Sequence, residues 1–296
     1  MTFQIPPHTF ILLLLAAPPL AAQTIVDLNF SNHVESTNGM WPNASSLGPA
    51  YYSGGTMHFT DVATVNGVAV DAVVTVSGTQ GAYNLVGWIP NYNNQSGANE
   101  GNLGVYSVFN GTYPDATTSA VGGVTYQITF YVGGEALLAD ERYQTQMVLP
   151  AFRFLVYDHD GEPTQAESLT AFYAEGFRGY QIRNGSGITT ESDGLSTTFH
   201  SRGSNHPETD DSGGFIAYFE DTSSISFQLT ASTTHEAVGP AGSLGNTYGI
   251  FTALDGNLSL IDGNTVNFGA FTPVPEPSFM LLTAFAAMGG VMRRKR

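Results

Sequence analysis

The most informative absences in this sequence are those of cysteine and lysine. The chain of 296 residues contains no cysteine and a single lysine, Lys295. Without cysteine, disulfide scaffolds, zinc–thiolate sites, thiol catalysis and iron–sulfur clusters are all excluded. Charged residues make up 11% of the chain, compared with about 25% in typical soluble domains. Its polarity therefore depends on Ser, Thr, Asn and Gln side chains and on the backbone of 34 glycines.

Positive charge is also scarce, and it is unevenly placed. Nine Lys+Arg residues stand against 25 Asp+Glu residues, which gives a formal net charge of −16. Four of the nine are the last four residues, Arg293 to Arg296, and only five arginines lie between Gln23 and Pro273. A nucleic-acid partner is not expected, because phosphate binding needs clustered Lys and Arg. The acidic, lysine-free region from Gln23 to Pro273 has a composition that favours an extracellular protein.

No hydrophobic run near the N-terminus is long enough to span a bilayer. Residues Phe10–Ala17 are apolar, but a membrane-spanning helix needs about 20 such residues. The run is followed by Pro18-Pro19 and then by the small residues Ala21-Ala22. This layout predicts a secretory signal peptide over residues 1–22, with cleavage after Ala22. The alternative is a buried N-terminal strand or helix.

The C-terminus carries three elements in a fixed order. Val274-Pro275-Glu276-Pro277-Ser278 is followed by Phe279–Met292, fourteen residues without a charge, and then by Arg-Arg-Lys-Arg. As a helix, the uncharged segment would be about 21 Å long, and the basic side chains beyond it can extend its fit to a bilayer. The pattern predicts a Pro-rich hinge, a short transmembrane helix and a basic tail that stays in the cytoplasm.

This ordered tail closely resembles the PEP-CTERM sorting signal of Gram-negative bacteria. The resemblance covers Val274–Arg296 and no part of the region before it. It implies that an exosortase, a membrane-embedded transpeptidase-like enzyme, recognises and processes the chain at Pro275, Glu276 and Pro277. Proteins with this signal are often associated with exopolysaccharide, biofilm or floc matrix. The alternative is an ordinary C-terminal anchor that contains Pro-Glu-Pro by accident.

The region from Gln23 to Pro273 shows the period-two alternation of β-strands. Val124, Tyr126, Ile128, Phe130 and Val132 share one face of a strand, while Thr125, Gln127 and Thr129 share the other. Similar stripes or short apolar runs predict strands at Thr24–Phe30, Val68–Val76, Leu103–Phe109, Pro150–Tyr157, Ser168–Ala174, Gly214–Glu220, Ser224–Thr230 and Thr247–Leu254. Turn signals such as Asn66-Gly67 and Asn184-Gly185 separate them. The sequence therefore predicts one all-β domain over residues 23–273, an antiparallel β-sandwich with jelly-roll-like topology.

A candidate metal site follows one of the predicted strands. In Tyr157-Asp158-His159-Asp160-Gly161-Glu162, carboxylates at alternate positions precede a glycine turn. Their oxygens can converge on one cation, and Ca²⁺ accepts six to eight oxygen ligands. We therefore consider structural calcium held by Asp158, Asp160 and Glu162, with Glu167 as an alternative third acid. A turn formed by Asp and Gly in a solvated hairpin explains the same residues.

A second cluster, His200 to Asp211, holds two imidazoles and three carboxylates, but its spacing favours a solvated loop over a metal site. Two tryptophan-containing segments, Trp88–Tyr92 and Trp41–Asn43, are candidate glycan platforms. Trp88 and Tyr92 lie at the head of a polar stretch and could stack on a glycan, although most aromatics of a sandwich pack in its core.

Enzymatic motifs are missing from the sequence. It contains no Gly-x-Ser-x-Gly, no His-Glu-x-x-His, no phosphate-binding loop and no dinucleotide fingerprint. The sequence thus predicts an exported protein that is not an enzyme. It is expected to be anchored in the inner membrane as a precursor and then placed at the cell surface or in the extracellular matrix. Its expected role is adhesion or structure associated with exopolysaccharide or biofilm. The alternative is an extracellular carbohydrate-binding module or polysaccharide-active enzyme, because two acids distant in sequence can meet in a fold.

Overall fold

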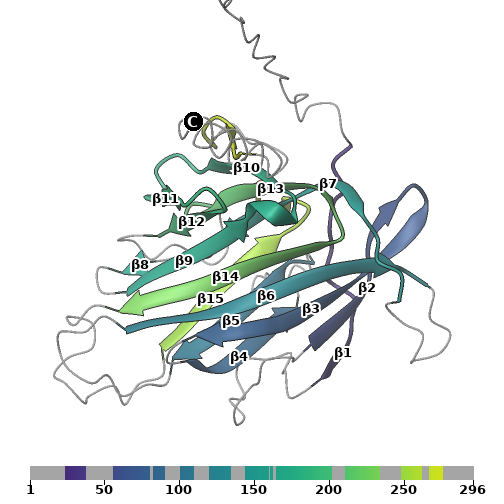
Figure 1. Cartoon of the computed structure of the whole chain (residues 1–296), viewed down its shortest axis with the longest axis horizontal. Coiled ribbons are helices and arrows are strands. Elements are labelled where there is room, and N and C mark those ends of the chain that lie inside the picture. Colours follow the sequence, from purple (N-terminus) through teal and green to yellow (C-terminus); the bar gives the residue numbers. More distant parts are fainter. Residues whose placement is uncertain are drawn as a thin grey trace, which may run out of the picture.

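The protein folds as a β-sandwich, as the sequence predicts. The computed structural model describes residues 24–37, 56–80, 83–90, 101–109, 120–134, 144–159, 161–162, 165–201, 211–233, 248–261 and 267–275. In these residues two antiparallel sheets pack face to face (Figure 1). The helices described are two single turns of 3-10 helix, η3 (Tyr173–Glu175) and η4 (Ser259–Ile261).

The first sheet contains nine of the described strands. Its strands lie side by side in the order β1 (His33–Thr37), β2 (Thr56–Val65), β3 (Val68–Gln80), β6 (Ala120–Val132), β14 (Ser224–Thr233), β9 (Gln165–Phe172), β12 (Ser196–His200) and β11 (Thr189–Ser192), and β8 (Gly161–Glu162) pairs with β9. We refer to it as the nine-stranded sheet.

The second sheet contains seven of the described strands and is called the seven-stranded sheet. Its order is β16 (Thr272–Pro273), β10 (Phe177–Ile182), β13 (Phe215–Thr222), β7 (Leu149–Tyr157), β15 (Tyr248–Asp255), β5 (Leu103–Phe109) and β4 (Tyr83–Pro90).

From β6 onwards the chain crosses repeatedly between the two sheets. β6, β9, β12 and β14 belong to the nine-stranded sheet, whereas β7, β10, β13 and β15 belong to the seven-stranded sheet. Within the sheets, β14 lies between β6 and β9, and β13 lies between β7 and β10. Segments close in sequence therefore face each other across the core, and segments far apart in sequence become neighbours in one sheet.

Large apolar side chains fill the space between the sheets. The predicted stripe Val124, Tyr126, Ile128 and Phe130 is fully buried. Aromatic rings meet in the centre, where the Phe152 and Phe219 rings are stacked with centroids 5.2 Å apart. Such pairs add to the stabilisation that burial of the rings already provides. The core thus follows directly from the alternation seen in the sequence.

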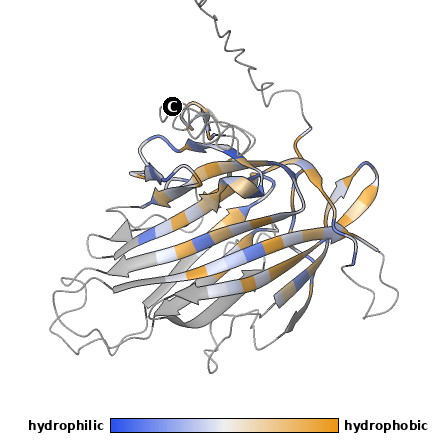
Figure 2. Cartoon of the chain, viewed as in Figure 1, coloured by the Kyte–Doolittle hydropathy of each residue, from blue (hydrophilic) through white to orange (hydrophobic). Residues whose placement is uncertain are grey.

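The outer faces of the two sheets differ. Along β6 and β14, hydrophilic and hydrophobic residues alternate (Figure 2), and Ser, Thr and Gln side chains face solvent on the nine-stranded sheet. The seven-stranded sheet instead buries a second apolar cluster on its outer side, made of Leu155, Tyr157, Ile216, Tyr218, Ala253, Leu258, Ile261 and Phe268. Ile261 of η4 and Phe268, which comes later in the chain, contribute to this cluster, so the outer face of β7, β13 and β15 is covered.

Residues 267–275, here called the C-terminal strap, run antiparallel along β10. The amide of Gly269 donates to the carbonyl of Ile182 at 2.8 Å, and the amide of Val274 donates to that of Arg178 at 3.0 Å. Thr272 and Pro273 form β16, in register with Tyr180 and Gly179. A side chain at Gly179 would clash with the Phe271 ring, because a Cβ there would lie 2.4 Å from its Cζ atom. The strap therefore completes the edge of the sheet.

One predicted strand is wrong. Thr24–Phe30 forms no strand and makes a single parallel bridge, between Val26 and Phe152. Its amides donate to different segments, Val26 to Ala151 and Leu28 to Gly256, while Phe30 donates to Gly101. Leu28 and Phe30 are completely buried. The apolar run closes one end of the core between the sheets, and no single partner strand could satisfy all of these donors.

The predicted signal peptide, residues 1–22, and most of the predicted sorting signal, residues 276–296, lie outside the described residues. A search of the described residues finds no helix with the length and apolar character needed to cross a membrane.

Candidate functional site

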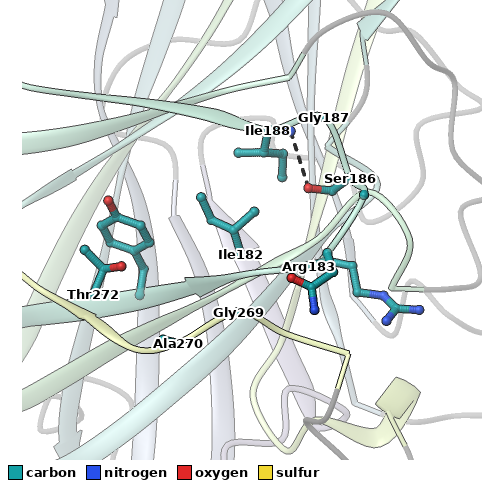
Figure 3. Close-up of a pocket in the computed structure, with 11 residues that line it drawn as sticks. Ile182, Arg183, Ser186, Gly187, Ile188, Gly269, Ala270 and Thr272 are labelled. Atoms are coloured by element: carbon teal, nitrogen blue, oxygen red, sulfur yellow. Dashed lines mark hydrogen bonds between the residues drawn. The ribbon is translucent and has the colours of Figure 1, made fainter.

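A pocket of about 350 Å³ opens at the edge of the seven-stranded sheet. Figure 3 shows three parts of the chain around it: the end of β10, the turn that follows it, and the C-terminal strap. The volume falls at the small end of the range of about 300–1,000 Å³ that is typical of ligand sites. The residues that line it include Tyr180, Ile182, Asn184, Ser186, Ile188 and Thr272.

Local sequence explains the turn that forms one wall. The amide of Ser186 donates to the carbonyl of Arg183 at 3.2 Å, which closes a four-residue turn. Gly185, the third residue of this turn, has a φ of +84°, a conformation that glycine adopts without steric cost. The Ser186 hydroxyl then accepts a hydrogen bond from the amide of Ile188 at 3.3 Å (Figure 3). The Asn184-Gly185 turn predicted from sequence is confirmed.

The opposite wall is the C-terminal strap, and several hydrogen bonds fix it against β10. The side-chain amide of Gln181 donates to the carbonyl of Gly269 at 2.9 Å. The Tyr218 hydroxyl donates to the side-chain oxygen of the same glutamine. The Phe271 ring meets the Tyr218 ring edge-on at 5.4 Å. Gln181 thus links the strap to the covered outer face of the sheet.

The charge at the pocket is already neutralised. Arg183 is the charged residue among those that line it. Its Nε atom lies 3.3 Å from a carboxylate oxygen of Asp211, and its guanidinium carbon lies 5.9 Å from the centre of the Phe268 ring. In Figure 3 the guanidinium group points away from Ile182 and Ile188. The pocket interior therefore offers apolar and uncharged polar groups.

The predicted calcium residues are placed only in part. Asp158 follows β7, is 4% exposed and has a φ of +52°, a left-handed conformation in which Asp is enriched. Asp160 lies outside the described residues. Glu162 falls in the short strand β8, in register with Gln165, and the alternative ligand Glu167 is 5% exposed. Among the described residues no group of three metal-ligating side chains comes together, and calcium at this loop remains a prediction.

Between these acids, His159 is completely buried. Its Nε2 atom lies 3.1 Å from the carbonyl of Phe199, so this nitrogen carries the proton and donates. Burial lowers the pKa of His159 to about 4, the hydrogen bond to Phe199 opposes this shift, and the charge of His200 adds to it. The Nδ1 atom has no hydrogen-bond partner among the described residues. The imidazole is therefore neutral at pH 7.

The other predicted residues lie apart from one another. Trp88 falls on β4, at the edge of the seven-stranded sheet, in register with Val105, and Tyr92 lies outside the described residues. Of the predicted sorting motif, Pro275 is the exposed last residue of the strap, while Glu276 and Pro277 lie outside the described residues. The glycan and sorting sites remain predictions.

Sequence reasoning missed a contact on the outer face of the nine-stranded sheet. The Ser168 hydroxyl lies 2.8 Å from Nδ1 of His200, and Nε2 of His200 lies 3.6 Å from a carboxylate oxygen of Glu191. The order hydroxyl–imidazole–carboxylate is that of a hydrolase triad. Ser168, however, pairs with strands on both sides, so its neighbouring amides are used in the sheet and are not available to an oxyanion. Ser168 and His200 come together because β9 and β12 pair in a register that the sequence alone does not reveal.

Comparison with known proteins does not assign the chain to a family. No protein-family model matches the chain, and no curated protein matches it in sequence. Among solved structures, the crystal structure of the N-terminal domain of the Streptococcus gordonii adhesin Sgo0707 is similar with a TM-score of 0.44 and 10% sequence identity, covering 78% of this chain and 63% of that chain. This chain thus matches less than two thirds of that domain, and a similarity at this level does not establish a shared function.

Proposed function

We propose that the protein is exported, is not an enzyme, and acts at the cell surface or in the extracellular matrix as an exosortase substrate. Its role would be adhesion or structure in association with exopolysaccharide. The observation that carries the proposal is the ordered tail from Val274 to Arg296. The exposure of Pro275 supports it, because a processing enzyme needs access to the residues that follow the fold.

The architecture agrees with this role. β14 between β6 and β9, and β13 between β7 and β10, are the strand orders expected of a jelly roll, which supports that finer assignment. Such sandwiches serve as rigid carriers for recognition loops.

The acidity of the protein constrains its partners. A net charge of −16 repels acidic polymers unless cations lie between them. Divalent cations can bridge carboxylates of protein and polymer, because Ca²⁺ accepts oxygen ligands from both. The proposal therefore includes adhesion that depends on divalent cations. Chelation that leaves cell-surface retention unchanged would count against this part.

The sorting step is testable in a Gram-negative host that contains an exosortase. The full chain with Pro275, Glu276 and Pro277 replaced by alanine is expected to accumulate in the inner membrane as the longer precursor. Glu191→Gln, at a side chain that is 81% exposed on the body of the fold, is the matched control and should be processed normally. Immunoblots of membrane, surface and medium fractions read out the result. Equal processing of the alanine variant and the native chain would refute the proposal.

A further inference from the structure

We propose that the pocket between β10 and the C-terminal strap binds one unit of a neutral saccharide. This inference deepens the proposed function and rests on it for the link to extracellular polysaccharide. The binding itself follows from the pocket, and it can be measured without any sorting step.

The shape and the polarity of the pocket both fit a sugar ring. Ile182 and Ile188 give the pocket apolar surface (Figure 3). The Tyr180 ring, which meets the Phe199 ring edge-on at 5.0 Å, also lines the pocket. Uncharged hydrogen-bonding groups on Asn184 and Thr272 stand around these residues. A sugar ring has apolar CH faces and hydroxyl groups at its edges, and it therefore matches both surfaces. About 350 Å³ is room for a single ring.

The charges around the pocket favour a neutral ligand. The Arg183 guanidinium already pairs with Asp211 and points away from the apolar residues of the pocket. An anionic sugar would find no unpaired cation among the described lining residues and would be repelled by the net charge of −16. A cationic sugar would find no carboxylate among the residues that line the pocket. A neutral ligand incurs neither cost, since burying an unpaired charge is expensive.

The strap forms one wall of the pocket, and β10 with the turn after it forms the other. Thr272 and Gly269 belong to the strap, whereas Tyr180 belongs to β10 and Asn184 to the turn. A sugar bound here would contact both walls and would hold the strap on the sheet. Binding should therefore slow hydrogen exchange of the Gly269 and Val274 amides, which donate to β10.

Saturation-transfer NMR on the full chain, purified in a detergent without a sugar headgroup, tests the proposal. The probes are glucose, galactose, mannose, rhamnose and N-acetylglucosamine, with glucuronate and glucosamine as charged counterparts. We expect saturation transfer to the ring protons of at least one neutral sugar and much weaker transfer to both charged ones.

Gly269→Leu is the blocking variant. A Cβ at residue 269 would lie 3.5 Å from the Ile182 carbonyl oxygen and 3.8 Å from the Asn184 side-chain oxygen, which are ordinary contacts. The remainder of the leucine side chain then occupies the pocket, and binding should be lost. Asn184→Ala, at an exposed position, should weaken binding about fivefold through the loss of a hydrogen bond. Asn32→Ala, at an exposed asparagine outside the pocket, should bind like the native chain.

Three results would overturn the proposal: no transfer to any neutral sugar of the panel, unchanged binding by both Gly269→Leu and Asn184→Ala, or equal transfer to glucuronate. If Gly269→Leu does not fold, Thr272→Val and its matched control Thr145→Val replace it, since both threonines are exposed. Failure of sugar binding leaves processing at Pro275–Pro277 intact, whereas failure of sorting leaves the binding result intact. The two proposals can thus fail separately.

Discussion

The two sheets of the sandwich share one core, but the outer face of one is exposed to solvent and that of the other is covered. The nine-stranded sheet presents Ser, Thr and Gln side chains to solvent, as antiparallel sheets with one wet face commonly do. In the seven-stranded sheet, Ile261 of η4 and Phe268 of the C-terminal strap help to cover the outer face of β7, β13 and β15. Both the pocket and the C-terminal strap, which ends at Pro275, lie at the edge of the seven-stranded sheet. The C-terminal strap thus provides one wall of a pocket that the two sheets alone would not form.

The sharpest test of this difference is a pair of truncations on the two outer faces. Leu155→Ala removes a completely buried side chain from the covered face and should lower the free energy of unfolding by about 2–5 kcal/mol. Thr125→Ala, on the solvated face of β6, should change it by about 0.5 kcal/mol or less. Denaturant unfolding of the full chain measures both. Equal decreases in the free energy of unfolding for the two variants would show that the two outer faces are equivalent.

A second test compares a buried histidine with one on the solvated face. His159 has a pKa of about 4 in the folded chain against 6.5 when unfolded. Between these values the unfolded chain binds the extra proton, so stability is complete above pH 6.5 and falls by about 3 kcal/mol as the pH decreases to 4.

In His159→Gln, a side-chain amide can still donate to Phe199 but does not titrate, so this part of the pH dependence should disappear. His200→Gln, on the outer face of β12, should retain it. Unfolding midpoints at closely spaced pH values between 4 and 7 measure the slope. A slope that survives in His159→Gln would assign the effect to another group.

The smallest expected effect concerns calcium at the end of β7. If the loop binds Ca²⁺, a hundredfold excess over the dissociation constant stabilises the fold by about 2.7 kcal/mol. Asp158→Asn combined with Asp160→Asn should remove the shift between Ca²⁺ and EGTA in thermal unfolding. Asp221→Asn is the matched control, because Asp221 is exposed and has a φ of +50°, close to the +52° of Asp158. A midpoint of the native chain that does not respond to Ca²⁺ would make the loop a simple turn.

Much of the fold could be predicted from sequence, because alternation depends only on each strand and its buried face. The stripe from Val124 to Phe130 predicted β6 and its contribution to the core. The covered outer face was missed, although Phe154-Leu155-Val156-Tyr157 is a continuous apolar run of the kind that strands buried on both sides show. The run predicts a strand, but it does not specify which segment covers the second face of that strand.

The candidate site was less predictable because it joins distant parts of the chain. The turn at Asn184-Gly185 has a local signal, but its neighbours Gly269 and Thr272 lie more than eighty residues further along. Nothing local specifies that the strap pairs with β10. The contact between Ser168 and His200 likewise depends on the register of two strands. Thr24–Phe30 has the composition of a strand, and only the scattered acceptors around it prevent one.

The strap has a consequence for the order in which the fold is completed. β10 is bordered on one side by β13 and on the other by β16 alone. During synthesis, residues 177–182 emerge long before residues 267–275, so β10 remains an open edge while the rest of the sandwich assembles. Open edges recruit strands from other molecules. A chain truncated before Asn267 should therefore polymerise through β10. In the full chain, the C-terminal strap covers this edge and protects the protein against aggregation.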